Sequence, residues 1–268
     1  MPELPEVETM RAGLEKKIKG RTISCVNVYD YPRRIDSAVR KNCLAKIKGV
    51  RRRAKLLVID LSNGYSIIIH VKLTGFFHFQ PRGKDFRKKI THVVFNFKDG
   101  SALLFNDVRK FGWVKIRKTS QVKKFLSGKF GPEPLGSEFT VKKFKEMLMK
   151  RKKSKIKPLL MDPKFIAGIG NIYAQESLYC AKILPMRQAG SLNNKEIKKL
   201  HDCIVRILEA SVKHKGTSAV DYLTVEGKKG TFASQLKVYQ QKKDPRGHKL
   251  TRIVMGSRGT NYCKVCQK

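Results

Sequence analysis

Six residues near the middle of the chain, Gly131 to Gly136, include two prolines and two glycines. Proline fixes φ and lacks an N–H group, and glycine weakens regular structure, so this segment suits neither a helix nor a paired strand. We therefore predict a linker at residues 131–137. The hydrophobic patterns before and after it differ, which predicts an α+β chain built from several domains.

The part before the linker is expected to form a β-sandwich preceded by a helix. Apolar residues spaced three and four apart predict a helix from Glu6 to Lys17. Strands are predicted at residues 56–61, 65–73, 93–97 and 102–105. The turn at Asp99-Gly100 is a strong hairpin signal. We assign residues 1–130 to this domain.

The part after the linker is predominantly helical. Phe144 to Leu148 fit a short amphipathic helix, and a longer one is predicted from Asn193 to Gly216. The tail from Val238 onward is predicted to be a β-hairpin rich in lysine and arginine. These patterns predict a helical domain at residues 138–233 and a hairpin finger at residues 234–268.

The charge of the chain points to a polyanionic partner. It has 59 lysines and arginines against 21 acidic residues, a formal net charge of +38. Such an excess favours nucleic acid, although a solvated basic surface is an alternative. The basic residues are spread along the whole length, which disfavours a membrane-surface helix. No signal peptide pattern opens the chain, and Cys25, Cys43, Cys180 and Cys203 stand alone, so we expect reduced thiols in a cytosolic protein.

The first residues carry a chemically suggestive group. Removal of Met1 would leave Pro2 with a secondary amine, and α-amino groups have pKa values of about 7.7 to 8.0. Such an amine can attack a sugar carbon and form an iminium ion, with Glu3 and Glu6 as acid/base groups. The alternative is structural: Pro2 would position a helix whose positive end the glutamates favour.

The segment PELPEVET after Met1 resembles the opening of the formamidopyrimidine-DNA glycosylase and endonuclease VIII family, and later landmarks follow in the family's order. The resemblance implies that Pro2 is the nucleophile, that Glu3 assists opening of the sugar ring and that Glu6 supports that step. It also implies that Lys55 and His70 contact DNA phosphate.

Further residues of the resemblance concern extrusion of the damaged base. Leu73 stands where the family typically has a methionine that helps fill the gap left by the base. Arg109 is similar to the residue that pairs with the orphaned base, and Phe111 to the wedge that unstacks its neighbour. An enzyme that acts at C1′ must take the nucleotide out of the stack, so inserted side chains make physical sense.

Two landmarks follow the linker. Gly168-Ile169-Gly170-Asn171 resembles the family's helix-two-turns-helix, which implies that Asn171 binds phosphate. The segment from Gly216 to Phe232 is similar to the flexible loop that closes over an oxidised purine, with Thr217, Tyr222 and Lys228 as its expected residues.

The tail contains half of a zinc site. Cys263 and Cys266 have CxxC spacing, and the resemblance implies a second pair upstream, but residues 242–249 contain no cysteine. A mixed site with His248 and Asp244 is one alternative. The sequence favours a finger without zinc, and hence no cofactor. Arg258 still matches the family's phosphate-binding finger arginine.

These features predict a bifunctional DNA glycosylase/AP lyase that removes oxidised purines, 8-oxoguanine and formamidopyrimidines, from damaged double-stranded DNA. We expect a monomer in the bacterial cytoplasm, associated with the nucleoid through DNA and not with a membrane. One alternative is an endonuclease VIII-type glycosylase for oxidised pyrimidines, which the missing methionine favours. Another is a catalytically inactive DNA-binding relative, which the altered finger favours.

Overall fold

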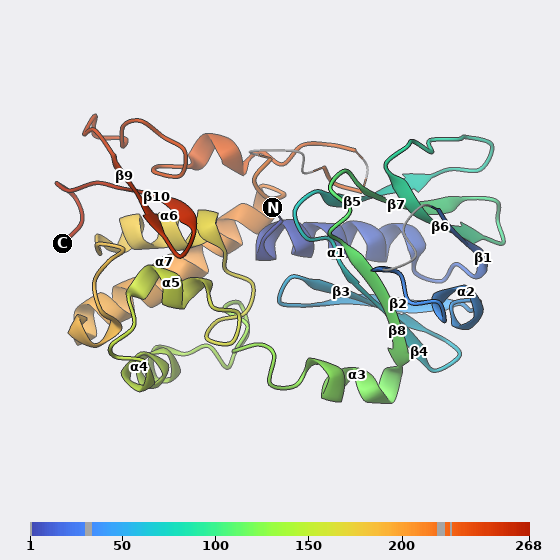
Figure 1. Ribbon diagram of the computed structural model, residues 1–268, viewed down its shortest axis with the longest axis horizontal. Coiled ribbons are helices and arrows are strands. Elements are labelled where there is room, and N and C mark those ends of the chain that lie inside the picture. The colour runs from blue at the N-terminus through green and yellow to red at the C-terminus, as the bar shows by residue number, and fades with distance from the viewer. Residues whose placement is uncertain (1, 30–33, 219–222, 226) are drawn as a thin grey trace. The chain divides into compact units, whose positions relative to one another are not determined.

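The computed structural model describes residues 2–29, 34–218, 223–225 and 227–268. The chain forms two compact units, one made of residues 1–127 with 214–231 and the other of residues 128–213 with 232–268. Figure 1 shows their helices and strands. Each unit is described by itself below.

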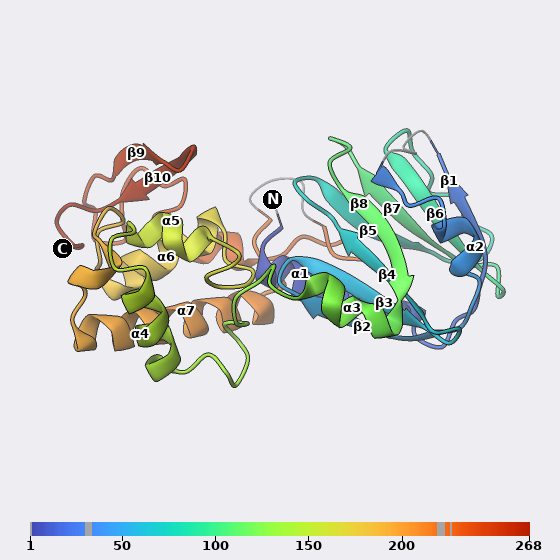
Figure 2. The same cartoon turned by 60° about the horizontal axis from the view of Figure 1, so that its bottom comes forward.

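The first unit contains two four-stranded antiparallel sheets, whose layers are visible in Figure 2. One sheet has the strand order β1-β6-β7-β5 and the other β2-β3-β4-β8. Their strands are β1 (Ile23–Val28), β2 (Ile47–Arg53), β3 (Leu56–Leu61), β4 (Tyr65–His70), β5 (Gly75–Gln80), β6 (Thr91–Phe97), β7 (Ala102–Asp107) and β8 (Trp113–Lys118). Apolar side chains from both sheets, among them Leu57, Ile69, Phe95 and Phe105, form one buried core. Such a core between two sheets is the defining feature of a β-sandwich, as predicted.

Among the described residues of this unit, three helices accompany the sheets: α1 (Leu4–Ile18), α2 (Val39–Asn42) and α3 (Thr119–Leu126). Helix α1 packs on β2 and β3 and buries Val7, Met10 and Leu14 in the sandwich core. It begins earlier than predicted because Glu3 and Glu6 form a capping box at its start. The helix therefore fixes the first residues of the chain against the sheet.

The second unit is helical and ends in a hairpin. Its elements are α4 (Val141–Lys150), α5 (Ile156–Met161), α6 (Asn171–Ala181), α7 (Asn194–Lys213), two short 3-10 turns and the hairpin strands β9 (Thr251–Met255) and β10 (Arg258–Tyr262). Tyr173, Leu178, Leu200 and Ile204 join α6 to α7 in a separate core. Within the described part of the chain, no helix combines the length and apolar character needed to cross a membrane.

The structure corrects several predicted element ends. Strand β4 ends at His70, before the predicted residue 73, because Lys72 adopts a φ of 54°. Helix α7 ends at Lys213, before Gly216, because Lys215 and Gly216 adopt left-handed conformations. The prediction missed β1, β2, β5 and β8. In β1 and β2 the buried residues lie three positions apart, so they do not alternate with exposed ones. Strand β8 alternates regularly and β5 alternates over its first four residues, so the sequence carried a signal for these two that the prediction overlooked.

The predicted state of two cysteines is wrong. Cys180 on α6 and Cys203 on α7 form a disulfide, although we expected isolated reduced thiols. Packing of the two helices places their Cα atoms 6.0 Å apart, which sequence spacing did not indicate. Cys25 is exposed, and burial raises the pKa of the Cys43 thiol.

The compact units and the predicted domain boundaries differ at residues 214–231. We had placed this segment with the helices, but it belongs to the first unit, where the Thr217 N–H contacts Glu6 and the Val225 carbonyl accepts from Phe79. The finger shares a unit with the helices because Asn171 and Gln175 on α6 hydrogen-bond to β10.

Candidate active site and nucleic-acid interface

The N-terminal residues are held by a buried carboxylate. Pro2 is buried, and the side chains of Glu3 and Glu6 are each only 1% exposed. Glu6 Oε2 accepts a hydrogen bond of 2.8 Å from the Glu3 backbone N–H. This contact fixes the direction of the chain next to Pro2, so the proposed nucleophile and its neighbouring carboxylate have a defined place.

The other oxygen of Glu6 holds a distant loop. Glu6 Oε1 accepts from the Thr217 N–H at 2.7 Å, and Gly216 lies so close that a Cβ would come 2.9 Å from the Glu6 Cγ. Gly216 also has a φ of +83°, which favours glycine. One carboxylate thus links the start of α1 to the start of the segment that follows α7.

The ends of that segment meet in the first unit. Thr217 pairs with Thr231 in an isolated β-bridge, and the Gly230 N–H donates to Ser218 Oγ at 2.8 Å. Thr217 is buried and Lys228 is exposed. The third predicted loop residue, Tyr222, lies outside the described residues.

His70 is the last residue of β4, and the structure defines its protonation. Its Nδ1 accepts from the Lys72 N–H at 3.0 Å, so a neutral ring carries its proton on Nε2. Burial, with the nearby charges of Lys72 and Lys55, lowers the pKa of His70 to about 3. Lys55 itself lies half-buried at the turn between β2 and β3. The predicted pair Lys55 and His70 is therefore brought together, with a neutral N–H donor beside a cation.

The loop that carries Arg109 and Phe111 is fixed by Asp107, a residue that the sequence did not single out. Asp107 is fully buried at the end of β7. Its Oδ1 accepts from Thr74 Oγ1 at 2.5 Å and from the Arg109 N–H at 3.2 Å, and its Oδ2 accepts from the Gly112 N–H at 2.7 Å. The carboxylate thereby fixes both ends of the 109–112 loop.

The side chains on this loop are presented outward. Phe111 is 39% exposed, and the Arg109 guanidinium carbon lies 5.0 Å from the Phe111 ring centroid. Leu73 is half-buried in the turn that follows β4, directly before Thr74. Thr74 Oγ1 also accepts from the Arg109 N–H at 3.0 Å, which ties that turn to the loop. The three predicted filler residues thus sit on two connected turns.

In the second unit, Asn171 is held from two sides. Its Oδ1 accepts from the buried Lys157 Nζ at 2.6 Å, and its Nδ2 donates to the Gly259 carbonyl at 3.1 Å. Asn171 is the first residue of α6, where backbone N–H groups favour anions. Lys157 was missed because a lysine in the apolar stretch IKPLLM shows no signal of its own.

A groove of about 990 Å³ lies between α6 and the hairpin of the second unit. Asn171 and Gln175 line one side. The cationic residues that line it are Lys242, Lys243, Lys249, Arg252 and Arg258. Arg258 is exposed at the start of β10. A basic groove beside a helix N-terminus suits the phosphate backbone of a nucleic acid.

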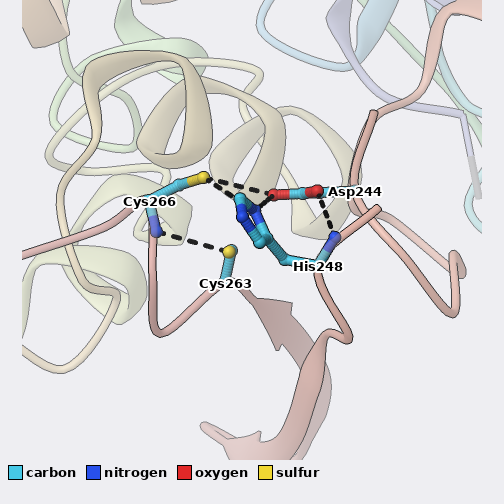
Figure 3. A group of neighbouring side chains, drawn as sticks. All are labelled: Asp244, His248, Cys263 and Cys266. Atoms are coloured by element: carbon cyan, nitrogen blue, oxygen red, sulfur yellow. Dashed lines mark hydrogen bonds and ion pairs between the residues drawn. The ribbon is translucent and has the colours of Figure 1, made fainter. Parts of the chain in front are cut away.

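Four potential metal ligands meet where the chain enters β9 and leaves β10. The side chains of Asp244, His248, Cys263 and Cys266 place their ligand atoms within 4.8 Å of one another (Figure 3). The sequence names all four, with Asp244 and His248 only as alternatives to the missing cysteine pair. Burial and the hydrogen bond to Asp244 raise the pKa of the Cys266 thiol to about 11. Desolvation raises the pKa of Asp244, but its hydrogen bonds, led by the one from His248, lower the pKa by more. The pKa therefore lies below its usual range.

Residues 1–114 match the family model of the formamidopyrimidine-DNA glycosylase N-terminal domain, and residues 130–222 match that of the formamidopyrimidine-DNA glycosylase H2TH domain. The chain belongs to the formamidopyrimidine-DNA glycosylase family. The resemblance drawn from its motifs is thereby confirmed, and so is the predicted fold class.

Family members similar to this chain match it over its whole length. The formamidopyrimidine-DNA glycosylase of Herpetosiphon aurantiacus is 39% identical over 276 residues and covers 100% of both chains. That of Enterococcus faecalis is 40% identical over 279 residues, covering 100% of this chain and 98% of the relative.

Solved structures agree with the family assignment. A mutant Lactococcus lactis FPG in complex with a Fapy-dG containing DNA has a TM-score of 0.92 and 36% identity, with 100% of both chains covered. The Lactococcus lactis Fpg in complex with an abasic site containing DNA has a TM-score of 0.91 and 36% identity, with 99% of both chains covered.

Proposed function

We propose that this protein performs base-excision repair as a bifunctional glycosylase/AP lyase, removing 8-oxoguanine and formamidopyrimidines from double-stranded DNA. Family membership supports the glycosylase and lyase activities, and the similar Lactococcus lactis structures contain lesion DNA and abasic site DNA. The observation that carries the proposal is the buried Glu6 carboxylate, which holds both the segment beside Pro2 and the Thr217 loop.

Pro2 supplies the nucleophile after removal of Met1. Its secondary amine forms a bond to C1′ as the bond from C1′ to the base breaks, and the base leaves with a proton. The buried Glu3 carboxyl protonates the ring oxygen as the sugar opens, which produces a C1′ iminium ion. Loss of the C2′ proton then expels the 3′ phosphate, and loss of the C4′ proton expels the 5′ phosphate.

The remaining site residues bind and deform the DNA. His70 donates its Nε2 proton to a phosphate oxygen beside Lys55, while Asn171 and Arg258 bind phosphate in the groove of the second unit. Arg109, Phe111 and Leu73 occupy the space that the extruded nucleotide leaves. Thr217, Tyr222 and Lys228 belong to the loop that covers the base.

Borohydride trapping tests the nucleophile, because it reduces the iminium ion to a stable covalent adduct. We expect the Met1-processed protein to be trapped on duplex containing 8-oxoguanine opposite cytosine. Trapping falls sharply in Pro2→Gly and in protein that retains Met1, while Cys25→Ser, which changes an exposed thiol, matches wild type. Undiminished trapping of Pro2→Gly would disprove the assignment.

A second comparison tests the substrate branch. We expect faster cleavage of 8-oxoguanine:cytosine duplex than of thymine glycol:adenine duplex. Faster cleavage of the thymine glycol duplex would indicate an endonuclease VIII-type glycosylase for oxidised pyrimidines. Lesion-dependent binding without strand cleavage would indicate a catalytically inactive DNA-binding relative.

We propose further that the protein acts on DNA as a monomer in the bacterial cytoplasm. Its charge of +38 supports association with the nucleoid through DNA. Sedimentation of the protein alone and on a single-lesion duplex measures its stoichiometry, for which we expect one chain per lesion.

A further inference from the structure

Asp244, His248, Cys263 and Cys266 form a compact group of four different donors in the second unit (Figure 3). Asp244 and Cys263 are buried, while His248 and Cys266 are half-buried. The group draws on two separate turns, residues 244–248 and residues 263–266. The ligand atoms of all four residues lie within 4.8 Å of one another, close enough for a single ion to reach all of them.

The first turn directs one oxygen and one ring nitrogen to the group. Asp244 Oδ1 accepts from the backbone N–H groups of Arg246 and His248, both at 2.9 Å. This leaves Asp244 Oδ2 facing the group, 3.0 Å from His248 Nδ1 and 3.2 Å from Cys266 Sγ. The backbone contacts fix the carboxylate before any ion arrives.

The second turn prepares the sulfur atom of Cys263. The Cys266 N–H donates to Cys263 Sγ at 3.3 Å, and the Cys263 N–H donates to Gln267 Oε1 at 2.9 Å. An N–H group aimed at a sulfur stabilises its thiolate form, which is the form that binds metal. Cys266 Sγ also lies 3.4 Å from His248 Nδ1, so both turns share one centre.

We propose that these four side chains bind one zinc ion, through two thiolates, one imidazole nitrogen and one carboxylate oxygen. Each belongs to a donor type that tetrahedral zinc accepts, and two thiolates favour zinc over magnesium or calcium. The site therefore replaces the missing upstream cysteine pair by Asp244 and His248, whereas the sequence alone favoured a finger without metal.

Tyr179 acts as the outer partner of the site. Tyr179 lies on helix α6, and its hydroxyl donates a hydrogen bond of 3.2 Å to Asp244 Oδ2. Hydrogen bonds to a ligand carboxylate orient it and tune its charge. The contact joins the metal site to the helix that begins at Asn171.

The C-terminal residues make a second connection, to the segment that directly follows helix α6. Gln267 Nε2 donates to the Ile183 carbonyl at 2.7 Å, and Lys268 exchanges backbone hydrogen bonds with Lys182 and Leu184. An ion bound by both turns would hold the two ends of the hairpin that carries Arg258 close to α6. Its loss is expected to weaken DNA binding while the residues of the first unit stay intact.

Metal content is the direct test. The full-length protein, purified without added metal and without chelator, is expected to contain one zinc per chain by elemental mass spectrometry. Cys266→Ser and His248→Ala should lose most of it. Cys25→Ser and Asp202→Asn, which alter exposed side chains outside the group, should retain it.

Cobalt exchange keeps the proposal testable if a variant fails to fold. Wild-type protein loaded with Co²⁺ should show the visible absorption of a tetrahedral site and thiolate-to-cobalt charge transfer, and a chelator should lower its melting temperature. Metal-free wild type with no tetrahedral cobalt spectrum would overturn the proposal. So would a Cys263–Cys266 disulfide in the freshly purified protein, or full zinc content in a Cys266→Ser, His248→Ala double variant.

Discussion

The Glu6 carboxylate accepts the backbone N–H of Thr217 at 2.7 Å, across 211 positions of sequence. Its second oxygen accepts the N–H of Glu3. A single buried side chain thus fixes the segment beside the proposed nucleophile and the start of the loop expected to cover the damaged base. Because backbone donors contact both oxygens, we expect Glu6 to position these two segments.

Glu6→Gln tests this positioning role. An amide keeps one acceptor oxygen but presents an NH₂ group to the other N–H, so one of the two contacts is lost. Hydrogen bonds to charged groups contribute about 1.5–3 kcal/mol, which corresponds to a loss of about 10- to 100-fold in excision of 8-oxoguanine. Single-turnover excision measures it. Glu209→Gln, at an exposed position of α7, should match wild type, and equal rates for both variants would contradict the role.

Gly216→Ala separates backbone strain from the contact with Glu6. Gly216 and Gly64 have φ values of +83° and +80°, but only Gly216 has a neighbour within 4 Å of an added Cβ. Both alanine variants should lose about 1–2 kcal/mol of unfolding free energy, because the left-handed conformation is strained. Excision activity should fall in Gly216→Ala alone. Urea unfolding and single-turnover assays make the comparison, and similar activity of the two variants would exclude the steric argument.

Phe111→Ala is expected to impair extrusion of the damaged nucleotide. Unstacking costs a few kcal/mol per step, and loss of the wedge should slow excision by about 10- to 100-fold. Phe86 offers a matched control in the same unit, since it is 40% exposed against 39% for Phe111. Phe86→Ala should excise at the wild-type rate. Fluorescence of a 2-aminopurine beside the lesion reports unstacking directly, and an unchanged signal in Phe111→Ala would argue against a wedge.

Lys157→Met tests how Asn171 is held. The Lys157 ammonium fixes Asn171 Oδ1, so its removal lets the amide rotate away from phosphate. We expect the Kd for lesion DNA to rise about tenfold, the value of one hydrogen bond to a charged group. The double variant with Asn171→Ala should bind no more weakly than Asn171→Ala alone, because both changes act on one contact. Additive losses would show that Lys157 contacts DNA separately.

Local sequence patterns predicted the parts of this protein that local physics determines. Helices α1 and α7 have regular apolar spacing, and strand β3 is a short, almost continuous apolar run. The resemblance of ordered motifs to the family then identified Pro2, Glu3 and Asn171 as site candidates. Strands such as β2, with four basic residues in Ile47–Arg53, gave no alternating signal because lysine and arginine cover their outer face.

Contacts between distant segments could not be predicted in this way. Asp107 and Lys157 act through hydrogen bonds to Thr74 and Asn171, and nothing in their own neighbourhoods indicates those partners. The disulfide between Cys180 and Cys203 depends on how two helices pack. The sequence offered the group of Asp244, His248, Cys263 and Cys266 only as an alternative, because these residues meet only when two turns, about twenty residues apart, fold onto each other.

His70 leads to a prediction about pH. Its pKa is lowered from 6.5 to about 3 in the folded protein by burial first and then by Lys72 and Lys55, whereas the unfolded chain keeps the ordinary value. Between these pH values the unfolded state binds the additional proton, so His70 makes the protein less stable as pH falls from 6.5 toward 3. The slope is at most about 1.4 kcal/mol per pH unit.

His70→Gln removes this contribution. As pH falls from 7.5 to 5, wild type should therefore lose more unfolding free energy than the variant does. Urea unfolding at several pH values measures it. Above about pH 7.5 the difference should be constant. Because the ring stays neutral, its effect on DNA affinity should not change between pH 6 and 8. A difference in stability that is independent of pH would show that His70 is protonated in the folded protein as readily as in the unfolded chain.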